Sequence, residues 1–94
     1  MRVSVALPGA LRSYARGQAE FAVDVPDGTT VDGLLDRLAV SEPALERRLR
    51  DERGVLRRHV NVYLGDEDVR TGGLLAQPLR DGDRVLVLPS VAGG

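Results

Sequence analysis

The sequence predicts a single α+β domain, a mixed sheet of four to five strands with one main helix on one face. Two runs of alternating apolar residues, 3–7 and 20–25, are about ten residues apart and predict a β-hairpin. The strongest helical periodicity follows over 31–38. Strand-like segments come after it, ending in an apolar run at 85–88. Hairpin, helix and later strands in this order are typical of an α+β fold.

Each element of the first half has a local signal. The connection 8–17 contains Pro and Gly and leaves room for one helical turn. Thr29 or Thr30 is a suitable N-cap for the main helix, and Asp32 places negative charge near its positive end. Spacings of three and four residues put the apolar side chains of this helix on one stripe, which is expected to face the sheet. The stripe consists of Val31, Leu34, Leu35 and Leu38.

The segment 41–58 is rich in arginine and gives a weaker signal. Pro43 can stand in the first turn of a second short helix, in which Leu45 and Leu49 are one turn apart. The arginines allow a docking patch for phosphate or protein. A solvated helix and loop is the favoured interpretation, because no aromatic residues interleave to stack on bases. The arginines of this segment are Arg47, Arg48, Arg50, Arg53, Arg57 and Arg58.

Strand periodicity returns at 59–64, and 67–70 reads as a short charged edge strand. Leu74, Leu75 and Leu79 are expected to close one end of the core. His59 is interpreted as an ordinary strand residue, since no carboxylate stands at a meaningful spacing. The acidic run 66–68 could bind a cation, but a solvated turn is favoured.

The last strand is predicted at 85–88. Asp81-Gly82-Asp83 forms a turn before it, with the aspartates bonding their own backbone, and Pro89 ends the hydrogen-bond ladder. In a right-handed ββαβ unit this strand can lie beside the first, at the centre of the sheet. Its continuous apolar run therefore predicts burial on both faces.

A tail of five residues, 90–94, follows the domain formed by residues 1–89 and is expected to be flexible. Gly93 and Gly94 have no Cβ, so the tail is thin enough to thread a narrow channel. Fully extended, it spans about 16 Å. Its terminal carboxylate could thus reach the active site of another protein, where activation such as adenylation would make it an electrophile.

Composition excludes several classes. A net charge of −1 does not suggest nucleic acid or an anionic membrane as partner. The absence of cysteine removes disulfides, thiolate nucleophiles and sulfur-based metal sites, and one histidine cannot build a metal site. All thirteen basic residues are arginine, which disfavours self-linked chains. No apolar run is long enough to span a bilayer, and no targeting segment is recognisable, so a cytoplasmic location is expected.

The chain resembles the ubiquitin-like β-grasp sulfur carriers of the ThiS/MoaD family, which includes the small subunit of molybdopterin synthase. Thr29-Thr30-Val31 at the helix start matches the family, but the most specific match is the terminal block, residues 81–94. Within the family, the branch that serves O-phosphoserine-dependent cysteine synthesis is the most similar, through Val60-Asn61-Val62-Tyr63 and the longer segment 41–58. The stretches that resemble the family are Asp81 to Asp83, Val85 to Pro89 and Val91 to Gly94, and those that resemble this branch include Asp66 to Arg70 and Pro89 to Gly94.

The resemblance implies a protein co-substrate, not an enzyme. A ubiquitin-activating-like enzyme would use ATP to adenylate Gly94, and a sulfurtransferase step would convert it to a thiocarboxylate. The thiocarboxylate would pass its sulfur to an acceptor enzyme, such as a cysteine synthase that binds pyridoxal phosphate. A metalloprotease would then release the new cysteine from the carrier. The chain would bind no cofactor and no metal itself. Gly93 would be the steric gate, Ser90, Val91 and Ala92 the threaded tail, and the sheet surface the docking face.

Two other interpretations stay open. The chain could be the small subunit of molybdopterin synthase, or, in a different class, a ubiquitin-like modifier or interaction module whose tail forms amide bonds. The sequence does not identify the metabolite that receives sulfur, the oligomeric state, or whether one activating enzyme serves several carriers.

Overall fold

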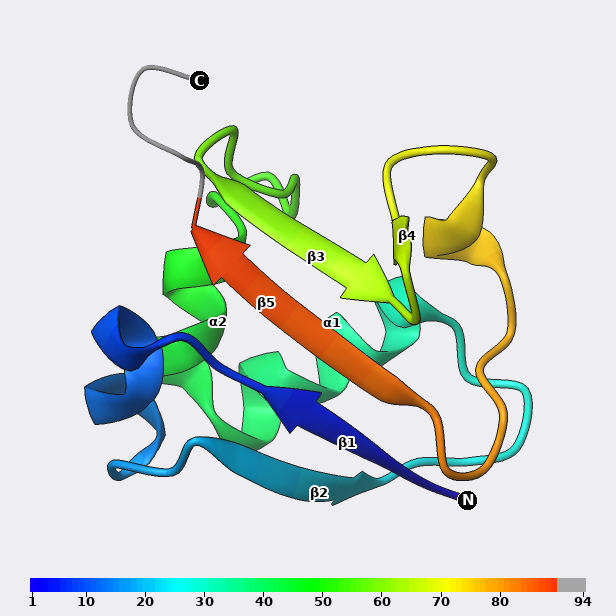
Figure 1. Ribbon diagram of the computed structural model, residues 1–94, viewed down its shortest axis with the longest axis horizontal. Helices are drawn as coiled ribbons and strands as arrows, with labels where there is room; N and C mark the ends of the chain where they lie inside the picture. Colours follow the sequence, from blue (N-terminus) through cyan, green and yellow to red (C-terminus); the bar gives the residue numbers. More distant parts are fainter. Residues whose placement is uncertain (90–94) are drawn as a thin grey trace.

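The computed structural model describes residues 1–89, and the tail predicted at 90–94 lies outside the described residues. A five-stranded sheet carries two α-helices on one side (Figure 1). The elements in chain order are β1 (Arg2–Ala6), the 3-10 helix η1 (Gly9–Ala15), β2 (Glu20–Asp24), α1 (Val31–Ser41), α2 (Pro43–Leu49), β3 (Val60–Leu64), β4 (Glu67–Asp68), the 3-10 helix η2 (Leu74–Ala76) and β5 (Arg84–Pro89).

The strand order is β2-β1-β5-β3-β4. β1 and β2 form the predicted antiparallel hairpin, with Val3 opposite Val23. β5 lies parallel to β1 and antiparallel to β3, so the last strand is the central one, as predicted. The mixed sheet with helices on one face confirms the α+β class.

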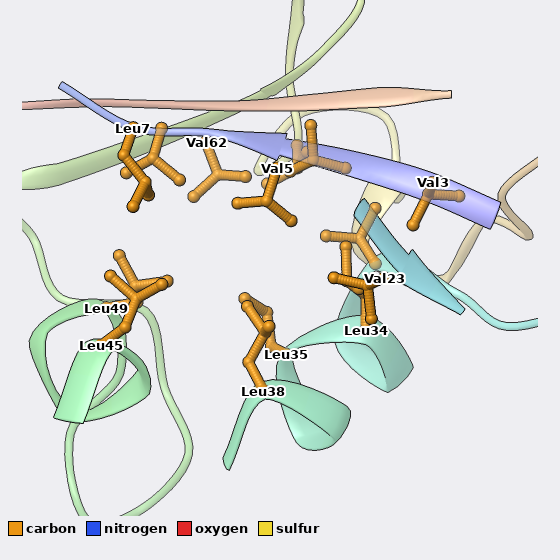
Figure 2. Close-up of a cluster of buried hydrophobic side chains, with 14 of the residues drawn as sticks. Val3, Val5, Leu7, Val23, Leu34, Leu35, Leu38, Leu45, Leu49 and Val62 are labelled. Carbon is orange, nitrogen blue, oxygen red and sulfur yellow. The ribbon is translucent and has the colours of Figure 1, made fainter. Parts of the chain in front are cut away.

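The core fills the space between the sheet and the two helices (Figure 2). Thr30 is the N-cap of α1, and its hydroxyl oxygen accepts a hydrogen bond of 3.0 Å from the backbone N–H of Gly33. The whole predicted stripe of α1 is buried, and α2 adds Leu45 and Leu49, both fully buried. The short helix predicted at Pro43 is therefore a second structural helix with its own share of the core.

The prediction that the last strand is buried on both faces is wrong. Val85 and Val87 are buried, but Leu86 is only half-buried and Leu88 is 37% exposed. Both helices pack on the side to which Val85 and Val87 point. The other face of the sheet has no covering layer among residues 1–89 (Figure 1). A central place in the strand order therefore does not bring burial on both faces.

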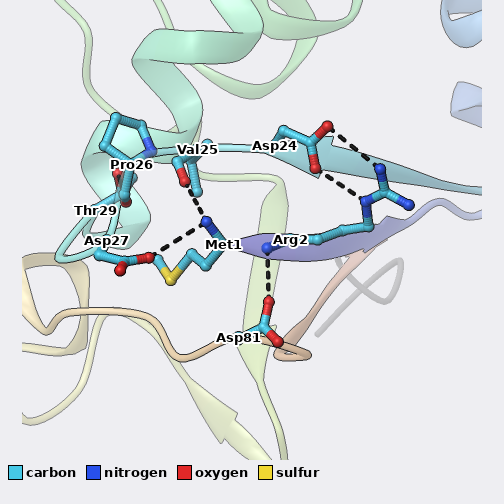
Figure 3. A network of polar contacts seen from close by, with 8 residues as sticks. All are labelled: Met1, Arg2, Asp24, Val25, Pro26, Asp27, Thr29 and Asp81. Carbon is cyan, nitrogen blue, oxygen red and sulfur yellow. Dashed lines mark hydrogen bonds and ion pairs between the residues drawn. The ribbon is translucent and has the colours of Figure 1, made fainter.

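The turn before β5 is fastened to the start of β1 (Figure 3). The carboxylate of Asp81 accepts a hydrogen bond of 2.8 Å from the N–H of Arg2, and the carbonyl oxygen of Arg2 accepts one of 2.8 Å from Gly82. Asp83 accepts from the N–H of Arg80, within the turn as predicted. Asp81 instead bonds across to β1, which corrects its predicted role and fixes where β5 begins.

Met1 and Arg2 also join β1 to β2 beyond the ladder. The amine of Met1 donates to the carbonyl oxygen of Val25 at 2.8 Å and lies 3.3 Å from the carboxylate of Asp27 (Figure 3). Arg2 pairs with Asp24 at 2.9 Å. That hydrogen bond, with the charge of Arg2, lowers the pKa of Asp24.

Across residues 1–89, none of the helices has the length and apolar character that crossing a membrane requires.

Candidate functional site

The site predicted from the sequence is the tail, and the structure shows what holds its base. β5 is hydrogen-bonded on both sides, to β1 and β3, and its last residue, Pro89, lies opposite Val60. The chain therefore reaches residue 90 from the most firmly held strand of the sheet, at the edge near η1 and α2 (Figure 1). This pairing gives the end of β5, at Pro89, a fixed position in the sheet.

The predicted site residues Ser90, Val91, Ala92, Gly93 and Gly94 all lie outside the described residues. Their proposed roles therefore remain predictions. Within residues 1–89, no cluster of three or more His, Cys, Asp or Glu side chains could hold a metal ion. The acidic run 66–68, considered as a cation site, forms no such cluster.

The uncovered face of the sheet bears a row of side chains that leads toward the tail. Leu86 lies between Ala6 of β1 and Tyr63 of β3, and Leu88 lies opposite Asn61. Leu88, at 37% exposed, is one of the few large apolar side chains left open to solvent in residues 1–89. Apolar side chains such as Leu86 and Leu88 on an uncovered face are suited to contact with another protein.

The sequence analysis missed this row because it treated the apolar run 85–88 as a sign of burial. Residues 60–64 carried the signal that could have found it. Val60 and Val62 alternate there with Asn61 and Tyr63, which indicates a sheet with only one covered face. A neighbouring strand in the same sheet must share that open face.

Arg50 fastens the second helix to the first. Its side chain is 8% exposed and pairs with Glu46 at 2.7 Å and with Asp36 of α1 at 2.9 Å. Burial acts to lower the pKa of Arg50, but the hydrogen bonds to Glu46 and Asp36 outweigh it and raise that pKa overall. The guanidinium therefore stays charged and holds α2 against α1.

Comparison with known proteins agrees with this arrangement of sheet and helices. The model of the ThiS family matches residues 5–94, nearly the whole chain including both terminal glycines. The chain belongs to the ThiS family. The sulfur carrier protein CysO of Mycobacterium tuberculosis is 40% identical over 96 residues, which cover all of both chains.

Other ThiS-like relatives bear different names. The molybdopterin synthase sulfur carrier subunit of Mycobacterium tuberculosis is 33% identical over 94 residues, covering 100% of this chain and 99% of that protein. Small archaeal modifier protein 1 of Haloferax volcanii is 36% identical over 78 residues, covering 83% of this chain and 85% of that protein.

Solved structures confirm the ubiquitin-like β-grasp fold expected of a ThiS-family member. The crystal structure of Mycobacterium tuberculosis CysO matches with a TM-score of 0.79 and 38% identity, over 95% of this chain and 99% of that one. A chain in the crystal structure of the Amycolatopsis orientalis BexX/CysO complex matches with a TM-score of 0.78 and 38% identity, over 98% of this chain and 99% of that one.

Proposed function

We propose that this protein is a sulfur carrier whose last residue, Gly94, is converted to a thiocarboxylate. The observation that carries the proposal is the full-length identity of 40% to a sulfur carrier protein, within a family match that runs through Gly94. The chain acts as a protein co-substrate, and partner enzymes perform the catalysis.

The chemistry takes place in two steps at one carbon atom. The carboxylate oxygen of Gly94 attacks the α-phosphorus of ATP, which forms an acyl-adenylate and releases pyrophosphate. Hydrosulfide from the sulfur donor then attacks the acyl carbon, AMP leaves with one of the original carboxylate oxygens, and the sulfur loses its proton. The net change is replacement of one carboxylate oxygen by sulfur. ATP is bound by the activating enzyme, and this chain contributes the reacting carboxylate.

The fold supports this role through the way it presents the tail. β5 is held on both sides and ends at Pro89, so the five residues that follow are joined to a strand whose position in the sheet is fixed. Gly93 and Gly94 leave the acyl carbon without a neighbouring side chain, which suits entry into a narrow active site. The chain contains no cysteine, so its terminal carboxylate is the group proposed to hold transferable sulfur.

The acceptor we propose is an enzyme of cysteine biosynthesis, such as a cysteine synthase that carries pyridoxal phosphate. A metalloprotease would then release cysteine from the carrier and regenerate Gly94. The higher identity to CysO than to the molybdopterin synthase subunit, 40% against 33% over the full chain, favours this acceptor. The CysO complex with BexX supports the expectation that such a carrier binds a partner protein through a defined surface.

Two alternatives have a specific observation behind them. As a small subunit of molybdopterin synthase, this chain would use the same proposed chemistry but stay in a lasting complex with a larger subunit, and its 33% identity to the molybdopterin synthase sulfur carrier subunit favours this alternative. The similarity to small archaeal modifier protein 1 supports an amide-forming modifier.

Intact-mass spectrometry tests the proposal. The chain is incubated with the ThiS-type adenylating enzyme of its source organism, ATP and a sulfur donor. The proposal predicts a mass gain equal to one oxygen-to-sulfur exchange, dependent on ATP. An adduct joined by an amide bond to a lysine of another protein would favour the modifier, and an unchanged mass would contradict both. Transfer of sulfur to cysteine or to a pterin then separates the two carrier interpretations.

A further inference from the structure

A cationic hollow lies beside the start of β3, which pairs with the end of β5. It has a volume of about 380 Å³ and gathers residues from η1, α2 and the segment that precedes β3. We call it the arginine groove. Its lining consists of Tyr14, Ala44, Arg47, Arg48, Arg57 and His59.

The arginine groove itself holds no carboxylate, although Arg47 and Arg57 also border a neighbouring hollow that is lined by Glu46, Asp51 and Glu52. None of its three arginines forms an ion pair with a carboxylate of residues 1–89, although Arg2, Arg16, Arg50, Arg53 and Arg84 all do. A protein with a net charge of −1 thus concentrates three positive charges in one concave place.

Two of these arginines are held in position by neutral groups. The guanidinium of Arg48 lies over the ring of Tyr14, 4.6 Å from the ring centre, at a distance typical of a cation–π contact. Arg57 donates from Nε to the carbonyl oxygen of Arg47 at 3.0 Å. These contacts order the side chains and leave their charge available to a ligand.

The dipole of α2 accounts for only part of this cluster. Arg47 and Arg48 stand in the last turn of α2, where a positive charge is favourable. Arg57, however, comes from a different segment and is folded back over the end of that helix. The helix dipole also gives no reason for a hollow with Tyr14 and His59 in its walls.

The arginine groove continues into an apolar hollow that reaches the base of the tail. A second cavity, of about 250 Å³, shares Tyr14, Arg48 and His59 with the groove and adds Leu11 and Leu88. Leu88 directly precedes Pro89, the last described residue before the tail. A protein that encloses the tail must therefore come close to these two hollows.

We infer that the arginine groove is a docking site for an acidic segment of the adenylating enzyme that receives the tail. That segment carries Asp or Glu carboxylates, which the arginines bind, and an apolar side chain that enters the hollow beside Leu88. Arginine forks fit carboxylates closely, and Arg and Tyr are frequent at the centres of protein interfaces. The inference rests on the proposed function for the identity of this partner.

A matched pair of double variants tests the inference. Arg47→Glu/Arg48→Glu reverses charge in the groove, whereas Arg37→Glu/Arg80→Glu makes the same change in net charge at exposed arginines of α1 and of the turn before β5. Affinity for the adenylating enzyme is measured by isothermal titration calorimetry at low and high salt. Each chain is also checked by circular dichroism melting.

The inference predicts that the groove variant binds about ten-fold more weakly at low salt, with the difference shrinking as salt screens the charges. The control variant should stay within about two-fold of the unchanged protein, as expected for charges outside the interface. The single variant Arg47→Glu covers the case in which the double variant unfolds, because the side chain of Arg47 makes no ion pair within residues 1–89. This single variant should bind about three-fold more weakly than the unchanged protein.

Equal weakening of both double variants, or no weakening of the groove variant, would overturn the inference. So would loss of self-association in the groove variant by sedimentation velocity, which would assign the groove to a second copy of the chain. Sulfur loading of the unchanged protein is followed in parallel. If the unchanged protein is loaded normally and the groove variant binds as well as it does, the docking inference is wrong but the proposed function stands. If the groove variant binds more weakly but the unchanged protein gains no sulfur, the result supports the groove and contradicts the proposed function. Absence of both binding and loading contradicts both.

Discussion

Replacing Arg50 with methionine should destabilise the domain, because Arg50 is the ionic link between α1 and α2. Its side chain is 8% exposed and contacts two carboxylates, at 2.7 Å on Glu46 and 2.9 Å on Asp36. Methionine fills much of the same volume but leaves the carboxylate of Glu46, only 14% exposed, without its cation. Asp36, at 72% exposed, can return to water at little cost.

The expected loss follows from this asymmetry. A partly buried carboxylate left unpaired costs about 2 kcal/mol of unfolding free energy. For a domain of this size that corresponds to a fall in Tm of about 8–16 °C. Asp36→Asn, which removes the exposed partner, should cost no more than about 0.5 kcal/mol.

Urea denaturation followed by circular dichroism measures the loss of unfolding free energy in Arg50→Met and in Asp36→Asn. A double-mutant cycle with Glu46→Gln isolates the interaction of Arg50 with Glu46. In the Glu46→Gln background the cost of Arg50→Met should fall by about half, because no carboxylate is left unpaired. Wild-type stability in Arg50→Met, or an equal cost in both backgrounds, would refute the view that Arg50 holds α2 in place by charge pairing.

Three further predictions concern the scaffold. Leu38→Ala, at a side chain 1% exposed, should cost about 3 kcal/mol of unfolding free energy in urea titrations, and an unchanged midpoint would contradict the described core. Gly82→Ala should cost about 1–2 kcal/mol because its φ of 87° strains a side chain, whereas Gly9→Ala, whose added Cβ meets no atom within 4 Å, should be near neutral. The N–H groups of Val55 and Arg53, and the charge of Arg53, lower the pKa of Asp51 from 3.8. Its contribution to stability should be complete above about pH 4 and be lost as pH falls through the lower folded value, and Asp51→Asn should flatten that acid limb.

Local signals made much of the fold predictable. The N-cap at Thr30, the helical stripe ending at Leu38 and the alternation of the first two strands depend on residues close in sequence, and all were confirmed. The central place of the last strand followed from the handedness of strand connections, and β5 does lie between β1 and β3.

Long-range contacts escaped prediction. Whether Leu86 and Leu88 are covered depends on where the helices pack, and a continuous apolar run carries no information about that. Asp81 bonds to Arg2, 79 positions away. The ion pair of Arg50 with Asp36 likewise joins separate helices.

The arginine groove shows the same limit for the candidate site. Its residues come from three segments, and in the sequence its arginines looked like part of a solvated helix and loop. The fold brings Tyr14 against Arg48 and folds Arg57 over the end of α2. The tail could be proposed as a site from the sequence because the proposed chemistry depends on residue types alone, glycines at a terminal carboxylate.

The most direct test of the account locates the sulfur within the chain. Because Arg84 is the last arginine and lysine is absent, trypsin releases residues 85–94 as one peptide. After reaction with the adenylating enzyme, ATP and a sulfur donor, tandem mass spectrometry should place one oxygen-to-sulfur exchange on Gly94 of this peptide. A chain lacking Gly94 should unfold at the same urea concentration and gain no sulfur. Sulfur on any other residue, or equal loading of the shortened chain, would contradict the account.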